Sequence, residues 1–277
     1  MIKALIWAEA FKLIKQTRTW YAIAAVFILE LIVLISAYFQ GTAIIDILLS
    51  NLKESFFFEG NLLNGNLIIY LILNSLWFNF PLILMLVISG MLTDEYKDGT
   101  LQTVMLQPIS KKWYILSKYL VATVFTLVMV FMLAISAFCF SYLVFGKSDL
   151  IVFIGKLNFF TSAEAETRLI LAFLSGSLSM IFFSLASLTF AIIFKDTLKT
   201  WIVSVLFLIV SNLLLKFDFK WDLINKLFYA KLNDTWQYFF YYEIPWNLIL
   251  RNNILLICYI FGLSAVGIII FNKKDIG

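Results

Sequence analysis

Six long apolar runs separated by polar segments set the pattern of this 277-residue chain. About 18–20 apolar residues in a helix cross a bilayer, and most of the runs reach that length. The fifth run is shorter and can extend back to Thr197. The pattern predicts an all-α polytopic membrane protein, with one domain over residues 1–277. Its predicted transmembrane helices cover about residues 20–39, 67–92, 119–145, 169–194, 201–215 and 248–271.

Composition supports this class and narrows the chemistry. Hydrophobic residues make up 62% of the chain and charged residues 14%, against roughly 25% charge in a soluble domain. An outer-membrane barrel would show short alternating segments instead. The chain has no histidine, which removes imidazole ligands and the usual general base. Cys139 and Cys258 each fall inside a run, so we predict neither a metal site nor a catalytic centre.

The distribution of basic residues predicts the orientation. With both termini inside, twelve of the 21 Lys and Arg residues fall in the inner segments, although the inner loops are much shorter. The positive-inside rule therefore favours cytoplasmic termini. The net charge of +4 fits a basic membrane face rather than nucleic-acid binding.

Two segments outside the runs are expected to lie along the membrane surface. Residues 1–18 mix apolar and basic side chains, and they predict an interfacial helix whose apolar face is interrupted by Glu9. A frayed basic tail is the alternative. Residues 217–247 are crowded with aromatic side chains, which favours interfacial anchoring in the outer leaflet over a sugar- or peptide-binding platform.

A polar island lies between the second and third runs, at residues 94–118. Gly99 allows a sharp change of direction, and Thr100 can cap a new helix. Pro108 ends that helix, because proline lacks an amide donor. The island therefore predicts a helix of about two turns on the cytoplasmic side.

The short helix carries one apolar face. Leu101, Val104 and Met105 fall at i, i+3 and i+4, which places them together. Such a face suits helix-in-groove binding to a cytoplasmic partner. An interfacial helix that touches only lipid fits the same pattern.

The island also resembles the intracellular-loop signature of the type-2 ABC exporter permeases. Six spans with inner termini, the basic amphipathic start and the end of the chain from Phe271 are similar to that family as well. The arginine common before the third span is replaced here by lysine. The resemblance rests on Glu95, Gly99-Thr100-Leu101, Pro108, Ser110-Lys111 and Lys118.

The resemblance implies that the loop from Glu95 to Lys118, with Val104 and Met105, contacts a separate ATP-binding subunit. It also implies that ATP and Mg lie on that partner and that this chain binds no cofactor. The chain does hold a Gly146-Lys147-Ser148 triplet, but Ser141 stands where a P-loop needs glycine. ATP hydrolysis by this chain is therefore not expected.

Three polar residues inside the runs are candidates for a translocation path. Glu30 lies near the middle of the first run, where a charge is costly. A protonated carboxyl satisfied by a neighbouring helix is the alternative. Asn74 and Asn79 lie in the second run and are expected to bond across helices.

The resulting hypothesis is the permease subunit of an ATP-driven exporter in a bacterial cytoplasmic membrane. Two copies, or this chain and a related permease, would pair with two ATP-binding subunits and move an unidentified substrate by alternating access. One alternative is the same fold relaying motion to an extracytoplasmic partner without transport. A passive lipid-interacting scaffold is another, and an intramembrane enzyme has few residues to work with.

Overall fold

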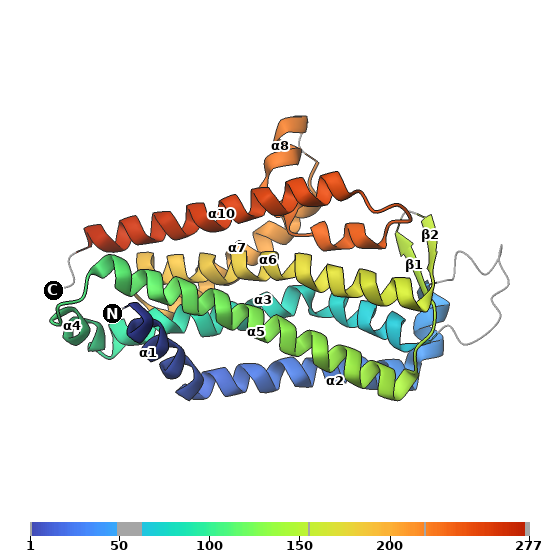
Figure 1. The fold of residues 1–277 in the computed structure, drawn as a ribbon, viewed down its shortest axis with the longest axis horizontal. Coiled ribbons are helices and arrows are strands. Elements are labelled where there is room, and N and C mark those ends of the chain that lie inside the picture. The colour runs from blue at the N-terminus through green and yellow to red at the C-terminus, as the bar shows by residue number, and fades with distance from the viewer. Residues whose placement is uncertain (1, 49–62, 155, 219, 275–277) are drawn as a thin grey trace.

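The computed structural model describes residues 2–48, 63–154, 156–218 and 220–274 and shows an elongated helical bundle (Figure 1). Within that part of the chain, six helices are long and apolar enough to cross a membrane, which confirms the predicted class. They are α2 (Thr17–Leu48), α3 (Gly65–Lys97), α5 (Lys111–Phe145), α6 (Ser162–Phe194), α7 (Thr197–Lys216) and α10 (Trp246–Lys273).

Most of these helices are longer than the apolar runs that predicted them. Helices α3, α5 and α6 have 33, 35 and 33 residues, or about 50 Å each at 1.5 Å per residue. Helix α7 has 20 residues and is about 30 Å long. A bilayer's hydrocarbon core is about 30 Å thick, so α7 alone matches it and the others extend beyond.

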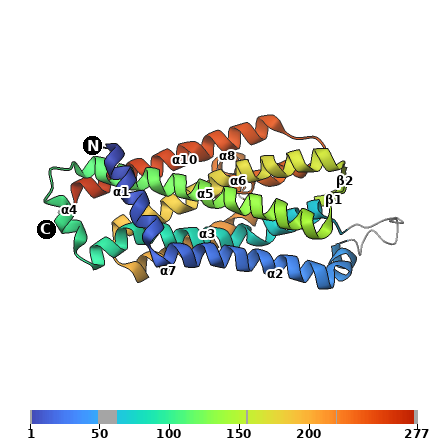
Figure 2. The same cartoon turned by 60° about the horizontal axis from the view of Figure 1, so that its bottom comes forward.

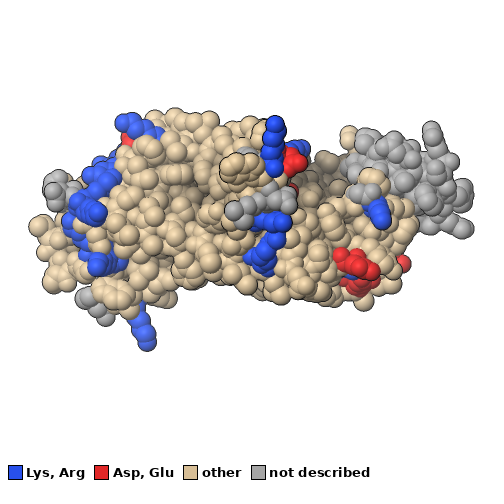
Figure 3. Space-filling view, turned by 90° about the horizontal axis from the view of Figure 1, so that it is seen from above, with Lys and Arg blue, Asp and Glu red and all other residues tan. Residues whose placement is uncertain are grey.

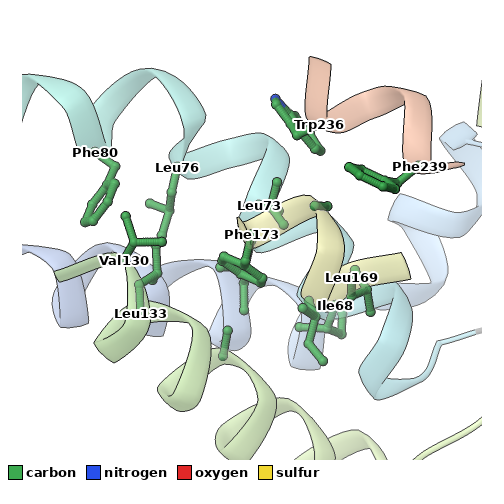
Figure 4. Packing of buried hydrophobic residues seen from close by; sticks show 14 of the residues in the cluster. Ile68, Leu73, Leu76, Phe80, Val130, Leu133, Leu169, Phe173, Trp236 and Phe239 are labelled. Carbon is green, nitrogen blue, oxygen red and sulfur yellow. The ribbon is translucent and has the colours of Figure 1, made fainter. Parts of the chain in front are cut away.

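Helix α6 lies at the centre of the bundle. In its most apolar window 78% of the residues are buried, a larger share than in any other candidate span. Small residues permit this close packing, and a Cβ added at Gly176 would collide with the Trp77 ring of α3. Figure 4 shows side chains from α3, α5, α6 and the 3₁₀ helix η1 (Thr235–Phe240) meeting in one core. It includes Ile68, Leu73, Leu76, Phe80, Val130, Leu133, Leu169, Phe173, Trp236 and Phe239.

A β-hairpin between α5 and α6 was not predicted. Strands β1 (Leu150–Ile154) and β2 (Lys156–Phe160) pair antiparallel, with Leu150 opposite Phe160. Both of these end residues are buried in the core. The hairpin therefore closes one end of the bundle.

Part of the aromatic segment after α7 packs into the bundle, while the interfacial anchoring expected of the segment stays a prediction. The segment forms α8 (Asp222–Leu227), α9 (Tyr229–Leu232) and η1. In η1, Trp236 and Phe240 are fully buried. Helix α7 stops midway along the bundle (Figure 1). Beyond its end, α9 and η1 pack on α10 and α6, while α8 projects away from the bundle.

The described ends of the chain lie at the same end of the bundle. Figures 1 and 2 show the N-terminal helix α1 (Ile2–Lys15), the C-terminal end of α10 and the short helix α4 (Thr100–Met105) together there. We call this the α4 end, and the opposite end the hairpin end. In Figure 3, Lys and Arg gather at the α4 end and again in a band midway along the molecule.

Candidate functional site: the α4 end

Helix α4 occupies the tip of the bundle, as the polar island predicts. Helix α3 continues through Asp94 and Glu95 to Lys97, so these acids form its last turn. Gly99 has a φ of 66°, a left-handed conformation that glycine adopts without strain, and it is the N-cap of α4. Thr100 is the first helical residue rather than the predicted cap. The chain therefore reverses direction between α3 and α4.

The apolar stripe of α4 faces the protein's own bundle. Leu101 is 1% exposed and belongs to a core cluster of α3, α5, α6 and α1 side chains. Val104 and Met105 are partly buried and pack on the same cluster. The side chain that points outward is Leu106, which is 88% exposed, and Gln102 lies on the same outer face. The helix is therefore docked on its own protein through the face expected to meet a partner.

A buried lysine lies beneath α4. Lys118 of α5 has no exposed surface, and its Nζ lies 2.6 Å from Oε2 of Glu9 and 3.0 Å from Oε2 of Glu95. It also donates to the backbone oxygen of Met91 at 2.9 Å. Glu9 comes from α1 and Glu95 from α3, so one ammonium joins three helices.

Two further side chains complete this arrangement, which we call the charge cluster: Glu9, Lys12, Glu95, Tyr114 and Lys118. The Lys12 ammonium lies 3.0 Å from Glu9 and 2.8 Å from Glu95. The Tyr114 hydroxyl donates to Glu95. Burial lowers the pKa of Lys12, but the hydrogen bond from Lys12 to Glu95 and the two nearby carboxylates outweigh burial and raise it overall. Both carboxylates are therefore paired and hydrogen-bonded, as buried charges require.

An ion pair at the edge of the cluster fastens the start of α2 to α3. The Arg18 guanidinium lies 2.6 Å from the Asp94 carboxylate. It reaches Asp94 by crossing Gly90, where an added Cβ would collide with it. The glycine therefore makes room for the arginine.

The remaining island residues lie between α4 and α5. Ser110 is the N-cap of α5, and Pro108 is exposed. Lys111 donates to the backbone oxygen of Lys274 at 2.8 Å, which ties the start of α5 to the end of α10. Lys111 and Lys118 therefore both bond within the chain in this structure.

Glu30 lies buried between α2 and α5. The Ser136 hydroxyl donates to its Oε2 at 2.6 Å, while Oε1 has no hydrogen-bond partner among the described residues. A neighbouring helix, α5, thus supplies a hydrogen bond to one carboxyl oxygen of Glu30. This is the arrangement expected if Glu30 is a protonated carboxyl satisfied by a neighbouring helix. Its place on a translocation path stays a prediction.

Asn74 and Asn79 are both exposed and lie at the two edges of the exposed surface of α3, because five residues turn an α-helix by about 140°. Their amides donate to backbone oxygens of their own helix, Tyr70 at 2.9 Å and Ser75 at 3.3 Å. The expected bonds across helices are therefore wrong, because both side chains point away from the neighbouring helices. Exposed amides in a membrane span are costly in lipid, so this face calls for a polar or protein environment.

Sequence reasoning missed the two α1 members of the charge cluster. In the sequence, Glu9 interrupts the apolar face of the N-terminal helix. In the structure it is 4% exposed and pairs with Lys118. The only local signal was its spacing from Lys12, since an acid and a base at i, i+3 share one helix face. That spacing does not identify partners on α3 and α5.

The fold and the α4 end together define a class: a membrane protein with six candidate spanning helices in the described part of the chain and a short helix packed over a buried cluster of paired charges. A family model described as ABC-2 family transporter protein matches residues 5–211. The match covers more than half of the chain, so the chain belongs to the ABC-2 transporter family, as the resemblance indicated. It is a multi-pass membrane permease subunit, a class separate from the ATPase, and the family implies an ATP-binding partner subunit. A search of curated proteins finds no match.

Proposed function

We propose that this permease works as an exporter in a bacterial cytoplasmic membrane, with the α4 end in the cytoplasm. Two copies pair, and each α4 receives one ATP-binding subunit that carries ATP and Mg²⁺. The observation that carries this proposal is the exposed outer face of α4 above the buried charge cluster. A surface that receives mechanical work needs a support that does not deform, and paired buried charges on three helices form one.

The contact with the ATPase is assigned to the outer face of α4 and the hollow beside it. Leu106 supplies the apolar contact, and Gln102 and Gln107 flank it. A hollow of about 420 Å³ separates α1 from α4, bordered by acidic and basic side chains that include Lys15 and Asp98. A partner helix can place an apolar residue on Leu106 and polar residues in the hollow.

Force on α4 would then move α1, α3 and α5 as one body. The exposed Asn74 and Asn79 face of α3 turns toward the second copy, where it lines the translocation path and escapes contact with lipid. A change in the angle between the two bodies opens the path to one side at a time. Basic residues near the α4 end favour the cytoplasmic orientation.

A relay to an extracytoplasmic partner is a second candidate, because the hairpin offers a surface for it. Phe153 and Phe159 lie on the same outward face of the hairpin, opposite Leu157 and Ile151 respectively, and are 58% and 57% exposed. Exposed aromatic side chains gathered on one face are typical of binding surfaces. This candidate predicts capture of an external partner without transport in reconstituted vesicles.

Replacing Leu106 by Asp tests the α4 assignment. The substitution places a charge at an apolar contact, so co-purification of the ATP-binding subunit should fall about tenfold or more, with normal membrane insertion. The matched control is Leu198→Asp, at another exposed leucine, in the first turn of α7. The control should retain the ATPase.

Equal retention of the ATPase by both variants would remove α4 from the interface. Equal loss in both would show that the contact is not specific to α4. In contrast, a selective loss in the Leu106 variant supports the assignment, since the two changes are chemically identical.

A further inference from the structure

A polar cavity of about 610 Å³ lies where α7 ends, among α8, α9, η1 and α10. Its size is within the range of about 300–1,000 Å³ typical of ligand sites. The cavity is distinct from the α4 end and from the exposed face of α3. Its charged lining residues are Lys216, Lys226, Lys231, Arg251, Asp218 and Asp234.

The charges of this lining favour an anion. Four of the six charged side chains are basic and two are acidic. Among the described residues, Lys216, Lys231 and Arg251 form no ion pair with a carboxylate. Asp218 instead accepts a hydrogen bond from Asn225 at 2.7 Å. The cavity therefore holds a surplus of positive charge.

The basic side chains keep donors available for a ligand. Lys231 uses one hydrogen bond, to the backbone oxygen of Leu215 at 2.6 Å. Arg251 directs its Nε and Nη2 to a single amide oxygen of Asn252, at 3.3 and 3.1 Å. A guanidinium carries five N–H donors and an ammonium three, so several can still meet an oxyanion.

The depth of the cavity indicates where its ligand comes from. Helix α7 matches the hydrocarbon thickness, with Lys195 and Lys199 near its first turn and Lys216 at its last residue. The cavity at Lys216 therefore lies at the level of lipid headgroups. Trp221 follows Lys216 closely in the sequence and is 72% exposed, as expected of an aromatic residue at the membrane interface. The basic band midway along the molecule in Figure 3 lies at this level.

We propose that this cavity binds the phosphate of an anionic phospholipid headgroup, with Lys216, Lys231 and Arg251 as donors. A phosphate supplies the negative charge that would balance the surplus of four basic over two acidic lining side chains, and the headgroup lies at the cavity's depth. The bound lipid would hold α7, η1 and α10 together where α7 ends. The proposal does not depend on the direction of transport or on the ATPase contact.

The test measures lipid binding to the purified full chain by native mass spectrometry. The probes are phosphatidylglycerol, phosphatidylcholine, and soluble glycerol phosphate. The double variant Lys216→Gln/Arg251→Gln removes two cavity cations. The control double variant Lys156→Gln/Lys220→Gln removes two exposed cations that do not line the cavity. Arg251→Lys, which keeps the charge, checks that the site still folds.

We expect wild-type protein, the control and Arg251→Lys to prefer phosphatidylglycerol, and the cavity variant to bind it about tenfold more weakly. Binding of glycerol phosphate as tight as that of the lipid, and equally lost in the cavity variant, would support the phosphate site but assign it to a soluble ligand. Equal lipid affinity in the cavity and control variants would overturn the proposal. So would equal affinity of wild-type protein for the two lipids.

Discussion

Both ends of the bundle bury a cation, but the two cations meet different partners. At the α4 end, Lys118 pairs with the carboxylates of Glu9 and Glu95, which belong to other helices. With Lys12, two ammonium groups meet two carboxylates, and this balance matters because an unpaired buried charge is costly. The cluster is thus a closed set of side-chain charges.

At the hairpin end, Arg168 of α6 meets mainly backbone. Its guanidinium donates to the carbonyl oxygens of Phe239 and Tyr241 at 2.6 Å each and of Tyr242 at 3.1 Å. One carboxylate, that of Glu164 on the same helix, lies 2.6 Å away. These carbonyls are at the end of η1, whose last groups have no helical partner.

The difference bears on how each end moves. Lys118 of α5 holds α1 and α3 to its own helix, so a displacement of α4 or α1 carries α3 and α5 with it. Arg168 holds one short segment to one helix, so η1 moves with α6 and leaves the other helices free. The α4 end is therefore suited to transmitting force between helices. The hairpin end is suited to holding η1 in place on α6.

The largest effect is expected from Lys118→Ala. It leaves the carboxylates of Glu9 and Glu95 with the half-exposed Lys12 as their remaining cationic partner, so the free energy of unfolding should fall by about 3–5 kcal/mol. The matched control is Lys147→Ala, which removes an exposed ion pair with Glu166 near the hairpin end and should cost less than about 1 kcal/mol. Denaturant titration of the purified chain in micelles measures both. Similar losses in the two variants would show that the cluster is not the buried, mutually dependent unit described above.

Arg168→Ala should come next, at about 2–3 kcal/mol. The substitution leaves buried carbonyl oxygens unpaired, but these are neutral, so the loss is smaller than for abandoned carboxylates. Arg168→Lys should recover part of it, since an ammonium still donates to carbonyls. Retention of the ATP-binding subunit should be unchanged in both variants, because the hairpin end lies far from α4. Loss of that subunit would contradict the separation of the two ends.

The long apolar runs were enough to predict the helices of the bundle but not the structure at its two ends. The six spans follow from long apolar runs, which have few other uses in a protein. The hairpin was missed because its two five-residue strands carry no long alternating pattern. The burial of Trp236 and Phe240 was missed because nothing local shows that α7 stops short and leaves part of α6 to be covered.

The candidate site was predictable only as a position in the chain. Gly99 and Pro108 mark a turn and a stop, so a short helix followed from local chemistry. The inward direction of Leu101 did not, because an apolar face has the same pattern whether it packs on its own bundle or on a partner. Glu9 and Lys118 are 109 positions apart, and their pairing exists only after three helices meet.

The smallest expected effect is a response to pH that distinguishes the cavity where α7 ends from the charge cluster at the α4 end. Asp234 precedes η1, and burial raises its pKa to about 6, while Trp236 and Lys216 act in the opposite direction. Since the pKa in the folded protein exceeds the ordinary 3.8, the protonated form is favoured by folding. This contribution is complete below about pH 4 and is lost as the pH rises through about 6.

Between about pH 5 and about pH 7.5, the free energy of unfolding should therefore fall by on the order of 1 kcal/mol, with allowance for partial exposure of Asp234. The Asp234→Asn variant should lack this slope. Lys12 of the charge cluster does not titrate in the same window, because its pKa is raised above 10.5. Lys12→Gln should lower stability by a similar amount at every pH in the window and keep the slope. Thermal unfolding across the window measures all three proteins, and a slope that persists in Asp234→Asn would place the titrating group elsewhere.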